Sequence, residues 1–328
     1  MQAPVPDDEA SRLLALRSME VLDTDPESDF DDIVALASEV CAAPISLVTL
    51  VDADRQWFKA KVGLAADETS RDVSFCAHAI LGKDLLVIPD ATADARFADN
   101  PYVKSDPGVR FYAGAPLVTS DGYALGTLCV VDHHPHRLSL DQLRALRALA
   151  RKVTEQLDLR RVSLVSASPP ILVDRDVDLA YLVSMLVGEL RPIASVRNIV
   201  VTLVAEGAPV VRADPHRLSQ ALDYVLFHAF RAAPPGGRLA VRVDATPAIR
   251  ARYSGVSIVP AWLADLADGQ PAAEPVPAAV ATVLRRHGIT GQVALDPVGM
   301  LDAGFELTFK QPVGSVGAAA RENVAPGR

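Results

Sequence analysis

Residues 214–237 read DPHRLSQALDYVLFHAFRAAPPGG. We expect a helix over 214–233, followed by a polar turn that ends in two glycines. Tyr224 and His228 lie four residues apart in this helix, so their side chains share one face. What that face can bind depends on these two residues.

The same stretch resembles the ATP-binding helix of sensor histidine kinases, whose usual pattern is D-P-x-R-L-x-Q-x-L-x-N-L-x-x-N-A followed by G-G. The matching positions are Asp214, Pro215, Arg217, Leu218, Gln220, Leu222, Ala229, Gly236 and Gly237. The two asparagine positions hold Tyr224 and His228 instead. The resemblance implies that the second asparagine would help to hold Mg²⁺ against the ATP phosphates. The candidate vestigial nucleotide site comprises Gln220, Tyr224, His228, Arg231, Gly236 and Gly237.

The other motifs that the resemblance requires for ATP binding and phosphotransfer are missing from the sequence. The D-x-G-x-G box, which would supply the adenine-binding aspartate, is replaced by Pro-Ala-Trp at 260–262. The phosphate-binding Gly-Leu-Gly-Leu slots at 274–277 hold Glu-Pro-Val-Pro, in which the prolines lack an N–H to donate. No histidine occurs between His136 and His216, so no phosphoacceptor is available there. We therefore expect no catalytic residue and no metal site.

The first half of the chain carries four long motifs in order. They are LVDADRQWFKAKVGL (50–64), RDVSFCAHAIL (71–81), IPDATADARFADNPYV (88–103) and RFYAGAPLVTSDGYALGTLCVVD (110–132). From Arg12 to about Arg160 the sequence resembles a GAF domain of bacterial signalling proteins. The resemblance implies an antiparallel sheet with helices on one face and a small-molecule pocket on the other, and it names no ligand.

The sequence argues against two known kinds of GAF ligand. Cyclic-nucleotide-responsive members carry an N-K…F…D-E signature, and none of this chain's asparagines precedes a lysine. Bilin-binding members use a Cys-His dipeptide, whereas here Ala77 separates Cys76 from His78. The ligand stays unknown and no cofactor is assigned. The candidate pocket residues are Phe75, Cys76, His78, Arg96, Phe97, Tyr112 and Asp132.

The three cysteines, Cys41, Cys76 and Cys129, form neither a disulfide framework nor a zinc motif. Cys41 and Cys129 are interpreted most simply as core residues. Cys76 is a small buried hydrophobe or, alternatively, a redox sensor. His78 is a packing or hydrogen-bonding residue or, alternatively, a haem ligand.

The bulk composition is that of a globular protein that meets other proteins. The chain has 328 residues, 50% hydrophobic and 22% charged, with a formal net charge of −9. This charge argues against nucleic acid or anionic membrane as a partner. The N-terminus has no apolar signal-peptide region, and no run approaches 18 apolar residues. We expect a cytoplasmic location.

The fold class is α+β: a GAF domain joined by a helix and a linker to a Bergerat-like α/β sandwich. The expected boundaries are a GAF domain at 1–138, a connecting helix at 139–165, a linker at 166–177, a degenerate kinase-type ATPase domain at 178–313 and a disordered tail at 314–328. Helices are predicted over 8–20, 26–42, 74–81, 139–164, 178–194, 214–233 and 275–288. Strands are predicted over 45–52, 55–63, 84–90, 110–119, 123–132, 198–207, 209–213, 238–246, 255–260, 291–298 and 305–312, with a long polar connection at 91–109. The helix over 139–164 carries a line of apolar residues at alternating spacings of three and four, which we call its seam. This seam fits either packing within the helix's own domain or a coiled coil between two copies.

These features predict a signalling regulator: a GAF sensor coupled to a catalytically inactive histidine-kinase-like domain that binds a partner. A homodimer is expected, and a histidine kinase or a response regulator is the candidate partner. Tyr224 and His228 belong either to a repacked vestigial pocket or to a repurposed ligand or partner site. Three rivals stay open: a divergent active kinase or ATPase, a GAF domain that reduces a small sulfoxide through Cys76 and a nearby second cysteine, and a dimerisation adaptor without a ligand.

Overall fold

The computed structural model describes residues 2–165, 173–246, 248–254, 280–281, 283–284, 289–295 and 302–309. Its helices are α1 (Glu9–Ser18), α2 (Ser28–Cys41), α3 (Phe75–Ala79), α4 (Pro101–Lys104), α5 (Leu140–Val165), α6 (Leu179–Arg197) and α7 (Pro215–Ala232), with a 3-10 turn at Arg71–Val73. Its strands are β1 (Ile45–Val51), β2 (Arg55–Val62), β3 (Glu68–Ser70), β4 (Leu86–Ile88), β5 (Phe111–Val118), β6 (Ala124–Asp132), β7 (Arg175–Asp178), β8 (Val200–Ala205), β9 (Val210–Ala213), β10 (Arg238–Asp244), β11 (Ala248–Ser254), β12 (Ile289–Leu295) and β13 (Asp302–Phe309). The α+β class is confirmed.

The N-terminal domain is built on one antiparallel sheet in the order β3-β2-β1-β6-β5-β4. Side chains alternate between the two faces of each strand. In β6, Leu128 and Val130 lie in the core beneath α2 and α5, whereas Cys129 and Val131 belong to the smaller core beneath α3. One layer of backbone therefore separates two different apolar environments.

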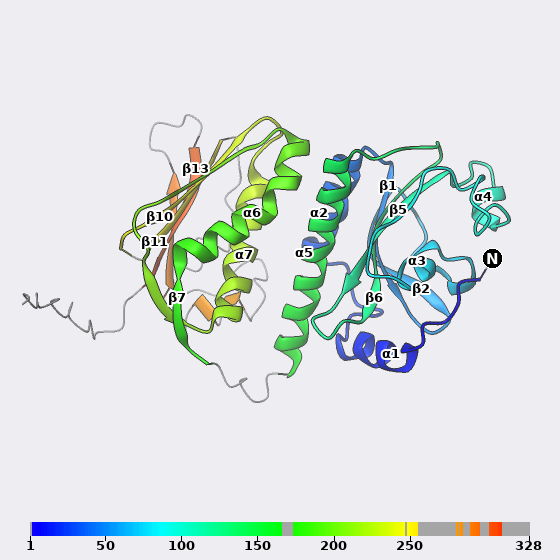
Figure 1. The fold of residues 1–328 in the computed structure, drawn as a ribbon, viewed down its shortest axis with the longest axis horizontal. Helices are drawn as coiled ribbons and strands as arrows, with labels where there is room; N and C mark the ends of the chain where they lie inside the picture. The colour runs from blue at the N-terminus through cyan, green and yellow to red at the C-terminus, as the bar shows by residue number, and fades with distance from the viewer. Residues whose placement is uncertain are drawn as a thin grey trace, which may run out of the picture.

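The C-terminal domain has a five-stranded sheet in the order β12-β13-β11-β10-β8, in which β8 and β10 are parallel. Helices α6 and α7 lie against this sheet (Figure 1). Helix α7 begins as its sequence predicts: the Asp214 side chain accepts the Arg217 N–H at 3.0 Å, and Pro215 occupies the first turn. Its apolar face, which includes Leu218, Leu222 and Val225, is buried.

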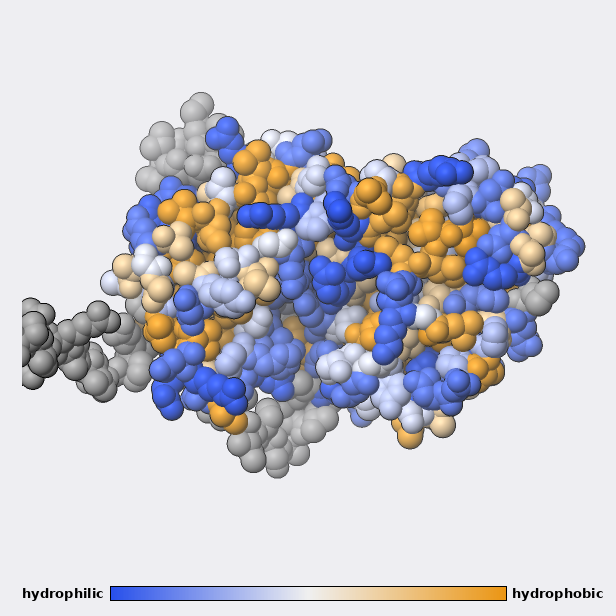
Figure 2. Space-filling model, in the orientation of Figure 1, coloured by the Kyte–Doolittle hydropathy of each residue, from blue (hydrophilic) through white to orange (hydrophobic). Residues whose placement is uncertain are grey.

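Helix α5 stands between the two sheets with α2 beside it (Figure 1). Of its predicted seam residues, Leu143 is half-buried, and Leu146, Ala150, Val153 and Leu157 are buried within the single chain. The seam therefore packs inside the molecule and is not available for a coil between two copies. One continuous hydrophobic core extends from the N-terminal sheet through α2 and α5 to α6, α7 and the second sheet. Figure 2 shows hydrophobic residues in patches on both domains, with mostly hydrophilic residues between them.

Several predicted elements need correction. The predicted linker at 166–177 contains β7, which pairs antiparallel with β9. The predicted polar connection at 91–109 contains α4, whose first turn is capped by the Asn100 side chain. Strand β11 was not predicted, and the strand expected at 255–260 lies outside the described residues. So do the tail at 314–328 and most of the helix expected at 275–288.

Helix α6 has the length and the apolar composition of a membrane-spanning helix. It is also the helix that joins the two halves of the core, because Val183, Leu190 and Ile193 are buried against its neighbours α5, α7 and β8. Within the described residues, α6 is the one helix with this length and composition.

Candidate functional site

A cavity of about 270 Å³ lies on the α3 side of the N-terminal sheet. Its lining is mostly apolar and comprises Ile45, Leu47, Gln56, Phe58, Leu64, Ala66, Thr69, Val73, Ser74, Phe75, Cys76, Tyr102, Ser105, Pro107, Val109, Tyr112, Cys129, Val131 and His133. No lysine, arginine, aspartate or glutamate is among these described lining residues. The cavity therefore suits a small uncharged molecule, and its volume is at the low end for ligand sites.

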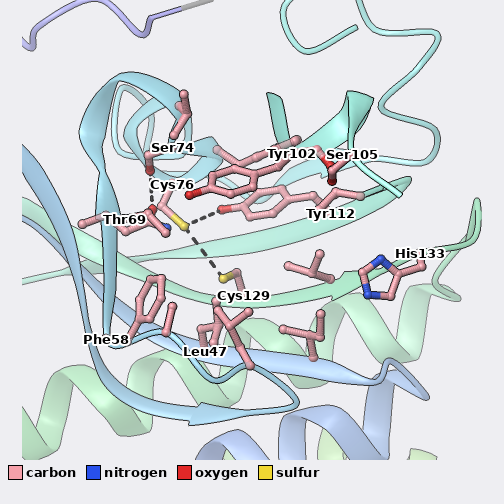
Figure 3. A pocket seen from close by; sticks show the side chains of 18 of the residues that line it. Leu47, Phe58, Thr69, Ser74, Cys76, Tyr102, Ser105, Tyr112, Cys129 and His133 are labelled. Carbon is pink, nitrogen blue, oxygen red and sulfur yellow. Dashed lines mark hydrogen bonds between the residues drawn. The ribbon is translucent and has the colours of Figure 1, made fainter. Parts of the chain in front are cut away.

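Two thiols meet in this cavity. Cys76 of α3 points toward Cys129 of β6, and their sulfur atoms are 3.8 Å apart (Figure 3). The Tyr112 hydroxyl lies 3.3 Å from the Cys76 sulfur and is directed at it. Helix α3 is held in place at its start, because the Ser74 hydroxyl accepts the Ala77 N–H at 3.0 Å and donates to the Gln56 side chain.

The surroundings make the two thiols unequal. Burial opposes ionisation of Cys76, but hydrogen bonds from Cys129, Thr127, Thr49 and Tyr112 outweigh it and lower the pKa of Cys76 to about 6. The hydrogen bond to Cys76, together with burial, raises the pKa of Cys129 well above its usual value. Cys76 is therefore the sulfur that these surroundings favour as a thiolate, which is the nucleophilic form of cysteine.

The structure divides the seven predicted pocket residues. Phe75, Cys76 and Tyr112 line the cavity, as expected. The others do not. Phe97 is fully buried behind Phe75, and the centroids of their stacked rings are 4.3 Å apart. The ring of His78 makes an edge contact with Phe97, with the ring centroids 4.8 Å apart.

The two charged residues predicted for the pocket serve local structure instead. Arg96 forms an ion pair with Asp94 at 2.6 Å on the surface. Asp132 accepts the backbone N–H of His134 at 3.0 Å and lies 3.6 Å from the ring of His136. Charged side chains at these positions therefore stabilise turns.

The prediction missed Cys129 as a cavity residue. Its location follows from strand alternation, because Cys129 and Val131 have the same parity in β6 and project to one face. The register that sets Cys129 opposite Leu47 of β1 and Gly114 of β5 then brings it beneath α3. The third cysteine, Cys41, is buried in α2, and its burial raises its pKa to about 12.

A second notable site is the face of α7 that bears Tyr224 and His228. The two rings contact each other, with centroids 4.3 Å apart. The Tyr224 hydroxyl lies 3.4 Å from Asp29 Oδ2, and His228 Nε2 lies 3.5 Å from Asp29 Oδ1. One turn further on, Arg231 forms an ion pair with Asp32. Both aspartates belong to α2, so this face of α7 is an interface between the two domains.

The remaining vestigial positions are also occupied within the protein. Gln220 accepts a hydrogen bond from Arg217 at 3.0 Å. The Gly236 N–H donates to the Arg197 carbonyl and the Gly237 N–H to the Pro234 carbonyl, each at 2.9 Å. Gly236 has φ +75°, a conformation that glycine adopts without strain. The two glycines therefore form the turn into β10, and their N–H groups are already used. The replaced boxes at 260–262 and 274–277 lie outside the described residues.

A buried cluster of charges completes the interface. Lys152 of α5 is only 2% exposed and donates to Asp223 of α7 at 2.5 Å. Its ammonium group also lies 3.3 Å from Glu155 and 3.4 Å from Glu189. Burial and the nearby carboxylate of Asp223 raise the pKa of Glu155 to about 9. One cation thus links a helix of the first domain to two helices of the second.

The antiparallel sheet and the elements packed on it thus enclose a cavity of a size that suits a small molecule. Residues 25–157 match the family model of the GAF domain, and this part of the chain is a GAF domain.

A cyclic di-GMP phosphodiesterase of Pseudomonas aeruginosa is 38% identical over 210 residues, which cover 61% of this chain and 36% of that protein. The chain thus spans about a third of the length of this curated relative. Among solved structures, the cytoplasmic segment of the histidine kinase QseC has a TM-score of 0.37 at 17% identity, covering 54% of this chain and 100% of that one. The GAF domain of an Acinetobacter phosphoenolpyruvate-protein phosphotransferase has a TM-score of 0.36 at 16% identity, covering 50% and 98%. At these TM-scores, neither structure defines the fold of this chain.

Proposed function

We propose that this protein is a signalling regulator in which a GAF sensor controls a kinase-like domain that acts by binding other proteins. The kinase-like domain does not transfer phosphoryl groups. Its partner is a histidine kinase, a response regulator or a second copy of this chain, and it works in the cytoplasm.

The observation that carries this proposal is the contact of Tyr224 and His228 with Asp29. These two side chains stand where the kinase pattern requires asparagines, and the face that they form is covered by α2. A nucleotide in the kinase-type position would bring its phosphates toward the carboxylates of Asp29 and Asp32, and like charges repel. The face of α7 that would meet a nucleotide in a kinase instead contacts the sensor domain.

The route from sensor to output is short in this arrangement. Helix α2 packs on the face of the sheet opposite the cavity, and the same helix contacts α7 through its aspartates. Its Glu39 also pairs with Arg197 of α6 at 3.1 Å. A change of shape in the cavity therefore reaches the second domain through the sheet and one helix.

The ligand that we propose is neutral. The P. aeruginosa relative is named for a reaction on cyclic di-GMP, which carries two phosphates. Among the described residues that line the cavity, none is a lysine or an arginine that would neutralise a phosphate. The cavity also argues against the adaptor without a ligand, since that alternative requires a GAF core filled by its own side chains.

The decisive experiment is thermal unfolding of the full chain with and without Mg-ATP. A ligand that binds the native state at one hundred times its Kd adds about 2.7 kcal/mol of stability. We expect no shift of Tm and no phosphorylation from labelled ATP, with an intact sensor histidine kinase as the positive control. Stabilisation by Mg-ATP, or autophosphorylation, would instead support the divergent kinase.

A further inference from the structure

The three cysteines are free, and two of them lie sulfur to sulfur in the cavity. They come from different elements and are 53 residues apart in the sequence. Strand alternation and the seating of α3 bring them together, and packing alone does not require a second thiol beside the first. We propose that Cys76 and Cys129 form a reversible dithiol–disulfide site, oxidised by a small neutral hydroperoxide that enters the cavity.

The geometry needs little change to form the bond. The sulfur atoms are in contact at 3.8 Å, and a disulfide requires a separation of about 2.05 Å. Helix α3 has only five residues, so a small shift of one short element closes the gap.

The surroundings assign a role to each sulfur. Cys76 is the attacking sulfur, because the Tyr112 hydroxyl donates a hydrogen bond to it at 3.3 Å. Hydrogen bonds to a thiolate favour the ionised form. Cys129 keeps its proton and is the resolving thiol. The low pKa of Cys76 and the raised pKa of Cys129 agree with this assignment.

The reaction proceeds in two steps. The Cys76 thiolate attacks the terminal oxygen of the hydroperoxide, the O–O bond breaks, and the alkoxide leaves as the alcohol after taking a proton. This gives a sulfenic acid on Cys76. The sulfur of Cys129 then attacks the sulfur of Cys76, the S–O bond breaks, and the hydroxide leaves as water with the proton of Cys129. Two thiols and one hydroperoxide thus give a disulfide, an alcohol and a water. A small cytoplasmic thiol reverses the oxidation by thiol–disulfide exchange.

The cavity determines which oxidants are admitted. Its mostly apolar lining, which includes no lysine or arginine among the described residues, suits hydrogen peroxide or a small alkyl hydroperoxide better than an anionic oxidant. The proposal stands on the cavity and the sulfur pair. It does not depend on what the kinase-like domain does, so failure of one proposal leaves the other untouched.

The test treats the reduced full chain with tert-butyl hydroperoxide and then alkylates all remaining thiols after denaturation. We expect mass spectrometry to find one alkylated cysteine, Cys41, and a peptide in which Cys76 is joined to Cys129. Added thiol restores all three alkylation sites. The variant Cys129→Ala accumulates a sulfenic acid on Cys76 that dimedone traps, and Cys76→Ala forms neither product. Cys41→Ala is the matched control and behaves as the native chain does.

A further variant tests the role of Tyr112. Tyr112→Phe forms the disulfide roughly tenfold more slowly, as expected for the loss of one hydrogen bond to a charged atom. Far-ultraviolet circular dichroism checks that the variants fold. The alkylation experiment on the native chain tests the proposal even if a variant does not fold. The proposal is overturned if all three thiols survive the hydroperoxide, if Cys76 is oxidised without joining Cys129, or if only a neutral sulfoxide forms the disulfide.

Discussion

The hydroxyl of Tyr224 lies 3.4 Å from a carboxylate oxygen of Asp29, although 195 residues separate them in the sequence. The contact joins the helix that resembles the ATP-binding helix of histidine kinases to a helix of the GAF domain. The same carboxylate group lies near His228, so one aspartate serves both residues that replace the kinase asparagines.

Asp29→Asn should loosen the domain interface. It weakens the contacts that the Asp29 carboxylate makes with His228 and Tyr224, which should cost about 1 kcal/mol of unfolding free energy. Hydrogen exchange should show faster exchange of the α7 amides. The control is Asp31→Asn, two residues away on the exposed side of α2. Equal exchange rates in the two variants would mean that the Asp29 contact does not hold the domains together.

Lys152→Met should be among the most damaging single substitutions at the interface. It leaves the buried carboxylate of Asp223 without its cation, which typically costs about 3–5 kcal/mol. Urea unfolding measures the loss, and the double variant with Asp223→Leu should recover most of it. Arg144→Met on the same helix breaks an exposed ion pair and should cost about 0–1 kcal/mol. A loss for Lys152→Met no larger than that of Arg144→Met would refute the buried linkage.

Glu155 should make the protein less stable as pH rises from 4.5 toward about 9. Its folded pKa is raised to about 9 from an ordinary 4.5, so within this window the folded chain keeps a proton that the unfolded chain has lost. The contribution of Glu155 to the unfolding free energy therefore falls with pH, whereas the lowered pKa of Cys76 acts in the opposite direction between about 6 and 9. Lys152, whose pKa is raised from 10.5, stays charged throughout, and Glu9, whose pKa is lowered to about 2, stays ionised. The urea midpoint of Glu155→Gln should increase relative to that of the native chain as pH rises; a constant difference between the two midpoints would contradict the assignment.

Gly114→Ala should displace Tyr112 from the cavity. A methyl group at Gly114 would lie 2.1 Å from the Tyr112 hydroxyl, so the buried ring must shift to admit it. We expect a loss of about 1–3 kcal/mol, as for other overpacked cores. Gly188→Ala, on the exposed side of α6 with nothing within 4 Å, should instead stabilise by about 0.5–1 kcal/mol. Thermal unfolding distinguishes the two, and a harmless Gly114→Ala would show that the ring can move.

Local sequence signals predicted most of the elements. The Asp-Pro start of α7 and the apolar face of α2 were sufficient, because caps and periodicity act within a few residues. Strand β7 was missed because four residues, three of them charged, carry no strand pattern of their own. It is a strand because it pairs with β9, where Val177 meets Val211.

The sites were predicted less completely, for a related reason. The motif around Cys76 and the Tyr112 strand pointed to the cavity, but Cys129 faces it only through the pairing of β6 with β1 and β5. The spacing of Tyr224 and His228 correctly gave them one face. The contact of this face with Asp29 depends on how two helices that are distant in the sequence pack together. The residue spacing within either helix does not encode that packing.

The continuous hydrophobic core changes what a domain boundary means in this chain. The boundary at residues 166–177 separates two stretches of sequence, but the apolar surface of α6 is buried partly by α5 from the other side of it. If the chain were cut at this boundary, each half would expose to water an apolar surface that now lies in the interior. Exposed apolar surfaces of this kind favour aggregation. The two halves should therefore unfold in a single cooperative transition, and they should be inherited together. If the sensor domain were exchanged without α2 and α5, the apolar surface of the output domain would be exposed to water.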